Sequence, residues 1–242
     1  MKNPTTEDHK DTNLWNKILN RAMQAPFVRV NRAEFLRKEL MRFIKPEEIE
    51  EAILDPRTKL NKNQLSKIAN GCIKYHLTIV CATSALAGLP GGWATLGAIP
   101  ADITQFYGHI FVLTQKLLYL YGWPELTNEE GMLDDGTAQI LTLFTGVMFG
   151  SQAATNTTKT LGQALSKGTL THLPKKALTK YAIYNITKQV GKWIGIKITK
   201  DSFARGVSKA IPLIGAPISA GLTYATFKPM ANKLNRHLNS LE

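Results

Sequence analysis

The stretch Leu77–Tyr121 reads LTIVCATSALAGLPGGWATLGAIPADITQFYGHIFVLTQKLLYLY and decides how the rest of the chain is interpreted. No Lys, Arg, Asp or Glu occurs between Tyr75 and Ala101, and Asp102 follows shortly after Pro100. Residues 88–92 contain three glycines and a proline, which combine high backbone entropy with a missing N–H donor. We therefore expect two apolar helices separated by a break, because the stretch is too interrupted for one membrane span.

The helix before the break carries apolar residues at i, i+3, i+4 and i+7 spacing from Leu65 to Thr83, and His76 lies on this stripe. A lone histidine on such a face favours a hydrogen-bonded core residue over a metal ligand. The helix after the break starts at Pro100 and ends at Gly122. Its apolar face is opposed by a polar column of Asp102, Gln105, His109 and Lys116.

Residues 1–60 have the pattern of a helical N-terminal extension made of short helices. The first should stop before Pro26, and the second should start at Asn31, where Glu34 completes a capping-box pattern. The domain that follows is predicted to span residues 61–242.

The second half of this domain contains an uncharged helix predicted from about Thr137 to Thr158, in which Gly146 and Gly150 would allow close helix approach. The apolar segment 210–227 is interrupted by glycine and proline, and a final basic helix is predicted to begin at Pro229. Strand alternation is not convincing anywhere. The predicted fold class is all-α, a multi-helix bundle with long apolar helices broken by glycine and proline.

Charge is divided unevenly along the 242 residues. Residues 1–157 hold 16 Lys plus Arg and 16 Asp plus Glu, whereas residues 158–242 hold 14 and 2, so the whole net charge of +12 lies in the last third. The mean hydropathy of −0.13 is that of a globular chain. A basic last third indicates an anionic partner, either phospholipid or nucleic acid, although a solvated basic face gives the same balance.

Around Trp193 the sequence has the pattern of a basic amphipathic helix, which is typical of elements that lie on anionic bilayers. Packing on the core with a solvated basic side would give this pattern too. The residues expected to bind an anionic surface are Lys175, Lys176, Lys180, Lys188, Lys192, Lys197 and Lys200. Nucleic acid is the less favoured partner, because most of the cations are lysines and no recognition motif is present.

Motifs for catalysis are missing from the sequence: it has no phosphate-binding loop, metal-binding cysteine pair or nucleophile elbow. The candidate polar site consists of His76, Asp102, Gln105 and His109, which could share a proton or a metal. Alternatively, Asp102 only satisfies free backbone N–H groups at its helix start. We expect no cofactor and no dedicated metal site.

Two features of the sequence indicate the cytoplasm. Cys72 and Cys81 lie nine positions apart on one predicted helix and cannot bond to each other, which suggests a reducing compartment. The polar N-terminus MKNPTTEDHKD lacks the apolar core of a secretion signal.

The run GLPGGWATLGAIPADITQFYGHIFVLTQKLLYLYGWPE, after the apolar lead-in ATSALA, resembles the core of EcsC-family proteins. The match would cover roughly residues 62 to 235. The matching signature positions are Gly88, Pro90, Gly91, Gly92, Pro100, Asp102 and Gly122. The resemblance implies a bacterial helical protein that associates with membranes, possesses no established reaction and has a membrane protein among its possible partners.

Taken together, these patterns predict a cytoplasmic protein that lies peripherally on the inner membrane and binds lipid. One alternative is a metal-dependent enzyme that uses Asp102 and His109. Another is a basic module that binds nucleic acid or acts on membranes as a toxin does.

Overall fold

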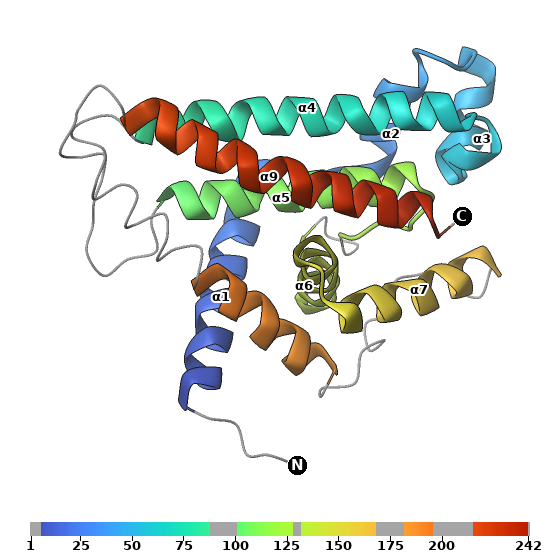
Figure 1. Cartoon of the computed structure of the whole chain (residues 1–242). Coiled ribbons are helices and arrows are strands. Elements are labelled where there is room, and N and C mark those ends of the chain that lie inside the picture. Colours follow the sequence, from blue (N-terminus) through green and yellow to red (C-terminus); the bar gives the residue numbers. More distant parts are fainter. Residues whose placement is uncertain (1–5, 88–100, 128–131, 168–181, 196–214, 242) are drawn as a thin grey trace.

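The computed structural model describes residues 6–87, 101–127, 132–167, 182–195 and 215–241. Within these ranges the regular structure is helical and contains no strand, as the all-α prediction requires (Figure 1). The elements before the long helices are α1 Thr6–Gln24, η1 Pro26–Val28, α2 Arg32–Leu40, η2 Pro46–Glu48, α3 Ile49–Leu54 and η3 Pro56–Thr58. The predicted start of the second helix is confirmed, since the Asn31 side chain caps α2 by accepting the backbone N–H of Glu34 at 2.9 Å.

Three long helices form the body of the molecule: α4 Lys62–Ala87, α5 Ala101–Leu120 and α9 Gly215–Asn239. Figure 1 shows α9 lying along α4 in the opposite direction, with α5 beside them. The Thr223 hydroxyl of α9 donates to Ser84 Oγ of α4 at 2.7 Å. The ring of Phe227 meets that of Phe106 on α5 edge to face at 5.7 Å.

The central helix is α5. Every residue from Phe106 to Leu120 is buried except Lys116, which is half-buried. The expected polar column of α5 is therefore enclosed in its C-terminal part and is not a solvent-facing side. Buried Gln115 shows how such groups are satisfied: its side-chain amide donates to the Val28 carbonyl at 2.7 Å, and its Oε1 accepts the Val30 N–H at 3.3 Å.

The prediction of one helix from Thr137 to Thr158 is wrong, because this region forms two helices: α6 Asp135–Phe149 and α7 Gln152–Ser166. Gly150 ends α6 with a left-handed backbone, φ 88°, which a residue with a Cβ adopts at a cost. Ser151 then caps α7. The predicted start of the last helix at Pro229 is also wrong, since α9 runs through this proline.

The helix can pass through Pro229 because its neighbours are packed on both sides. Phe227, Met230, Ala231 and Leu234 are all buried in the core. Burial of each of the larger side chains stabilises the folded protein by about 1.5 to 3 kcal/mol. This gain offsets the cost of the backbone hydrogen bond that proline cannot donate.

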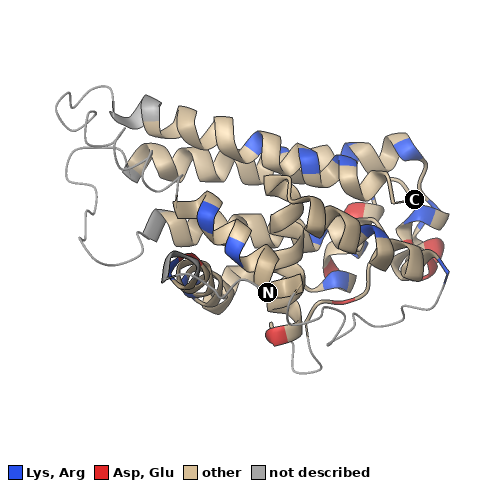
Figure 2. Cartoon of the chain, turned by 60° about the horizontal axis from the view of Figure 1, so that its bottom comes forward, with Lys and Arg blue, Asp and Glu red and all other residues tan. Residues whose placement is uncertain are grey.

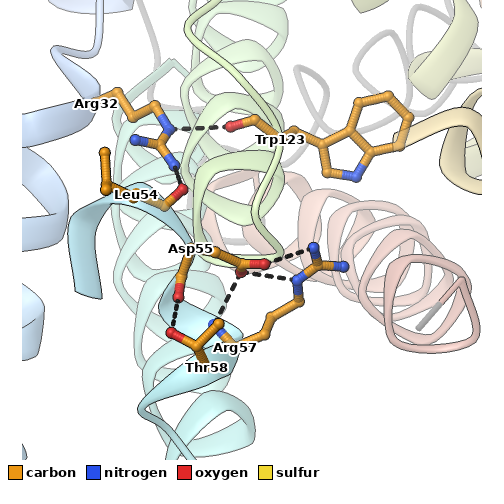
Figure 3. Close-up of polar contacts among 6 residues, drawn as sticks. All are labelled: Arg32, Leu54, Asp55, Arg57, Thr58 and Trp123. Atoms are coloured by element: carbon orange, nitrogen blue, oxygen red, sulfur yellow. Dashed lines mark hydrogen bonds and ion pairs between the residues drawn. The ribbon is translucent and has the colours of Figure 1, made fainter. Parts of the chain in front are cut away.

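Helices from residues 1–60 pack directly on the rest of the chain. Trp15 of α1 is fully buried, its indole N–H donates to Thr142 Oγ1 of α6 at 2.9 Å, and its ring meets those of Tyr107 and Phe111 edge to face. The guanidinium of Arg32 donates to the carbonyl oxygens of Trp123 and Leu54 at 3.0 and 3.1 Å (Figure 3). The division near residue 60 stays a prediction, but both parts contribute to one hydrophobic core.

The helical segment 182–195 lies against α1 and α6 through two glycines. A Cβ on Gly191 would overlap the backbone carbonyl of Asp11 in α1. A Cβ on Gly146 would come within 3.0 Å of Ile186 and 2.9 Å of Ala154, so the predicted close approach at Gly146 is present. Because glycine has no side chain, these two positions allow segment 182–195 to pack closely against α1 and α6.

None of the helices in the described ranges combines the length and the apolar character that crossing a membrane requires.

Candidate functional site

Two buried histidines face each other between α4 and α5. Nδ1 of His76 lies 3.0 Å from Nδ1 of His109, and the two residues are only 2% and 8% exposed. His76 comes from the apolar stripe of α4, and the expectation that it is a hydrogen-bonded core residue is confirmed. His109 comes from the first half of α5, where the ring of Phe27 packs against it at 5.2 Å.

Lys116, two turns beyond His109 on α5, completes what we call the histidine–lysine cluster: His76, His109 and Lys116. Its Nζ lies 3.2 Å from Nε2 of His76. The same ammonium group lies over the ring of Phe35 from α2 at 5.7 Å and over that of Tyr75 from α4 at 5.4 Å. Three helices therefore meet around one cation.

The contacts assign the proton positions in this cluster. A lysine ammonium group can only donate, so Nε2 of His76 must accept. In a neutral imidazole the proton is then on Nδ1, which donates to Nδ1 of His109. The proton of His109 consequently resides on Nε2, so the cluster is a directed hydrogen-bonded chain from Lys116 through His76 to His109.

Burial keeps both imidazoles neutral. Burial, together with the nearby Lys116 and His109, lowers the pKa of His76 from 6.5 to about 3. The pKa of His109 is lowered by burial and by Lys116. Neutral rings are what the directed chain requires, because a protonated His76 could not accept from Lys116.

Burial also lowers the pKa of Lys116. Among the described residues, no Asp or Glu lies within ion-pair distance of Lys116. Glu39 of α2 acts on it from farther away and is itself paired with Arg42 at 3.0 Å. The cation is thus held by aromatic rings and one imidazole.

Cys72, one turn before His76, does not extend the cluster into a metal site. Burial raises the pKa of its thiol to about 11, so it is a neutral thiol at neutral pH. Within the described ranges, no three His, Cys, Asp or Glu side chains are placed to hold one metal ion. Cys72 and Cys81 are both free thiols, as expected.

Of the four residues predicted for the polar site, the structure brings His76 and His109 together. Gln105 is half-buried one turn before His109. Asp102 is in the first turn of α5, but its side chain lies outside the described residues, and so does its predicted role at the helix start. Lys116 was recognisable from the sequence as part of the same column, whereas its partners on α2 and α4 were not.

Of the glycines on which the resemblance to the EcsC family rests, Gly122 lies within the described residues. It follows α5 with φ 78°, and a Cβ there would lie 2.8 Å from both Arg57 Nε and Asp55 Oδ1. Arg57 and Asp55 form a two-bonded ion pair at 2.8 Å (Figure 3). The other signature positions before α5, Gly88, Pro90, Gly91, Gly92 and Pro100, lie outside the described residues.

A second candidate site is at the junction of α6 and α7. Trp193 of segment 182–195 is 52% exposed and stacks on Phe149 at 6.1 Å with an interplanar angle of 12°. Exposed Lys192 is its neighbour in the chain, and the ammonium of Lys233 from α9 lies 2.9 Å from where a Cβ of Gly150 would be. We call Phe149, Gly150, Lys192, Trp193 and Lys233 the basic corner.

The last third of the chain is rich in cations and poor in acids. The described residues from 136 to 241 include no Asp or Glu. Figure 2 marks the Lys and Arg positions in blue and the Asp and Glu positions in red along the ribbon. The exposed cations are Lys159, Lys167, Lys192, Lys228, Lys233 and Arg236.

The predicted lysine set is only partly within the described structure. Lys188 is half-buried and Lys192 is exposed, both on segment 182–195. Lys175, Lys176, Lys180, Lys197 and Lys200 lie outside the described residues. The sequence did not indicate Lys233 as part of the basic corner, because only the packing of α9 brings it to the junction of α6 and α7.

Searches of protein-family models, curated proteins and solved structures found no match to this chain.

Proposed function

We propose that this protein binds peripherally to an anionic phospholipid surface and that the basic corner is its contact point. The observation that carries the proposal is the exposed Trp193, which stacks on Phe149 and follows the exposed Lys192 in the chain, while the ammonium of Lys233 lies next to Gly150. Tryptophan prefers the headgroup level of a bilayer, where its ring is partly apolar and its N–H meets water. The two lysines would meet lipid phosphates there.

Charge supplies the attraction. Each cation that reaches an anionic surface contributes about 1 kcal/mol, and this contribution weakens as salt screens the charges. The described residues from 136 to 241 contain no acid, although Asp11 of α1 packs against segment 182–195 and reduces the positive charge there. The sequence of segment 196–214 adds Lys197, Lys200, Arg205 and Lys209 to the same third of the chain.

Lipid is a better fit than nucleic acid. Twelve of the fourteen cations in residues 158–242 are lysines, whereas base recognition favours the planar, fork-shaped guanidinium of arginine. One face of the Trp193 ring is already covered by Phe149. An amphipathic tryptophan beside lysines suits the bilayer interface, because binding there does not require recognition of nucleic-acid bases.

A metal-dependent reaction at Asp102 and His109 is less well supported. Both ring nitrogens of His76 and Nδ1 of His109 are engaged within the histidine–lysine cluster, and a metal ion there would have to displace these bonds beside a lysine ammonium group.

The resemblance to the EcsC family is compatible with this function. We propose on that basis a bacterial cytoplasmic protein at the inner face of the membrane, with a membrane protein as a possible further partner.

Liposome flotation tests the proposal. The protein should float with vesicles that contain phosphatidylglycerol at low salt, less so at high salt, and not with pure phosphatidylcholine vesicles. Negligible flotation in every condition would reject the proposal. A gel-shift titration at physiological salt that gives tighter binding to DNA or RNA than to vesicles would favour the nucleic-acid alternative.

Matched charge reversals locate the contact. Lys192→Glu with Lys233→Glu should abolish most of the flotation. Lys62→Glu with Lys74→Glu changes the net charge equally on exposed positions of α4 and should reduce it only slightly. An equal loss in both pairs would show that net charge, and not the basic corner, controls binding. Trp193→Ala should weaken binding at high salt, where the aromatic contribution dominates.

A further inference from the structure

We propose that Lys116 is a nucleophilic amine that condenses with small aromatic or apolar aldehydes to form an imine, with His76 as the proton acceptor and His109 as a positioning residue. This activity does not depend on membrane binding, since the histidine–lysine cluster is formed by α4 and α5 and the basic corner by other helices.

The geometry is that of a nucleophile, a base and a group that orients the base. Nζ of Lys116 is 3.2 Å from Nε2 of His76, and Nδ1 of His76 is 3.0 Å from Nδ1 of His109. Nδ1 of His76 carries the proton and donates it to Nδ1 of His109. The basic nitrogen of His76 is therefore the one that faces the amine.

Lys116 is half-buried, whereas the other residues of α5 from Phe106 to Leu120 are buried. Tyr75, which is 59% exposed, and Phe35 border the Nζ atom with their rings. Flat apolar surfaces beside the amine favour an aldehyde that carries an aromatic or apolar substituent.

The surroundings favour the free amine. The groups that act on Lys116 are Lys38 and Glu39 from α2 and Cys72 from α4, and Cys72 is a neutral thiol at neutral pH. Burial lowers the pKa of Lys116 more than Glu39 raises it. A larger share of Lys116 is consequently unprotonated near neutral pH than of an exposed lysine.

The reaction balances without any added oxidant or reductant. One N–H of the free amine donates to Nε2 of His76, while the nitrogen lone pair attacks the carbonyl carbon and the C=O π electrons move to oxygen. Nε2 of His76 takes one proton from the nitrogen and passes it to the alkoxide, which gives the neutral carbinolamine. The remaining N–H proton then passes through Nε2 to the hydroxyl oxygen, while the nitrogen lone pair forms the C=N bond and the C–O bond breaks to release water. The products are the imine and one water molecule, and His76 ends as it began.

Trapping experiments on the full-length protein test this proposal. Benzaldehyde with cyanoborohydride at neutral pH converts each imine into a stable benzylamine, which peptide mass spectrometry assigns to its lysine. Lys116 should be modified severalfold faster than Lys62 and Lys74, which are exposed on α4. This preference should disappear above about pH 10.4, where ordinary lysines are also deprotonated, and in urea, where the cluster is lost.

Variants separate the roles. Lys116→Arg should remove the fast-reacting site, and His76→Gln should slow modification at Lys116 without changing Lys62. If Lys116 reacts no faster than Lys62 in the folded wild-type protein, the proposal is overturned, and this comparison requires no variant to fold. If His76→Gln leaves the rate at Lys116 unchanged, the assignment of His76 as proton acceptor is wrong. Vesicle flotation of Lys116→Arg should equal that of the wild type, which distinguishes this proposal from the membrane proposal.

Discussion

The Nδ1 atoms of His76 and His109 lie 3.0 Å apart, although the two residues are 33 positions apart in the chain. Their contact links α4 to α5 through neutral imidazoles, and Lys116 extends it toward α2 through the ring of Phe35. A protonated ring cannot accept in such a chain, so this link between helices depends on pH.

The stability of the protein should fall as the pH decreases below about 6.5. Burial lowers the pKa of His76 in the folded state from 6.5 to about 3, so the unfolded state binds more protons between these values. The free energy of unfolding therefore decreases with falling pH, by up to roughly 4 kcal/mol near pH 3 for this residue. Urea denaturation at a series of pH values measures the slope.

The control for this pH dependence is His76→Gln, which should flatten the slope in that window. His109 and His237 also have lowered pKa values caused first by burial, so some slope should persist in this variant. An unchanged slope in His76→Gln would show that His76 is not the group that titrates.

Gly191→Ala should destabilise the fold by about 1 to 3 kcal/mol, because the added Cβ would overlap the backbone carbonyl of Asp11 and force segment 182–195 away from α1. Gly71→Ala is the matched control on α4. A Cβ there meets nothing within 4 Å, so this change should stabilise by about 0.5 to 1 kcal/mol. Chemical denaturation gives both values, and equal effects would contradict the close packing at Gly191.

Gly122→Ala should cost more than Gly150→Ala. Both glycines have positive φ, 78° and 88°, so each substitution strains the backbone by about 1 kcal/mol or more. A Cβ at Gly122 would in addition press on the ion pair between Asp55 and Arg57, whereas at Gly150 it meets only the mobile end of Lys233. Thermal unfolding compares the two variants, and a larger cost at Gly150 would contradict this reading.

Trp15→Ala should lower the free energy of unfolding by roughly 3 to 5 kcal/mol, the range for removing a large buried aromatic side chain. The loss includes the hydrogen bond from its indole N–H to Thr142. Because Trp15 shares a core with Tyr107 and Phe111 of α5, we expect one unfolding transition that shifts as a whole. Two separate transitions, with only one affected, would instead support an independent N-terminal unit before residue 60.

The sequence by itself determined the helical class and several helix ends. Periodic apolar residues and the Gly88 break predicted the extent of α4, and the capping pattern at Asn31 predicted the start of α2. These signals are local, because capping bonds, proline and glycine act within one or two turns of the chain. Where burial overrode them the prediction was wrong: α9 continues through Pro229 because the residues around it are packed in the core.

Which polar groups meet depends on the packing of helices that are distant in the sequence. The seven-residue spacing placed His109 and Lys116 on one side of α5, but their partners His76, Tyr75 and Phe35 come from α4 and α2. Likewise, Lys233 reaches the basic corner from α9, far along the chain from Phe149. Such contacts depend on how helices distant in sequence pack against one another, and a local pattern contains no information about that choice.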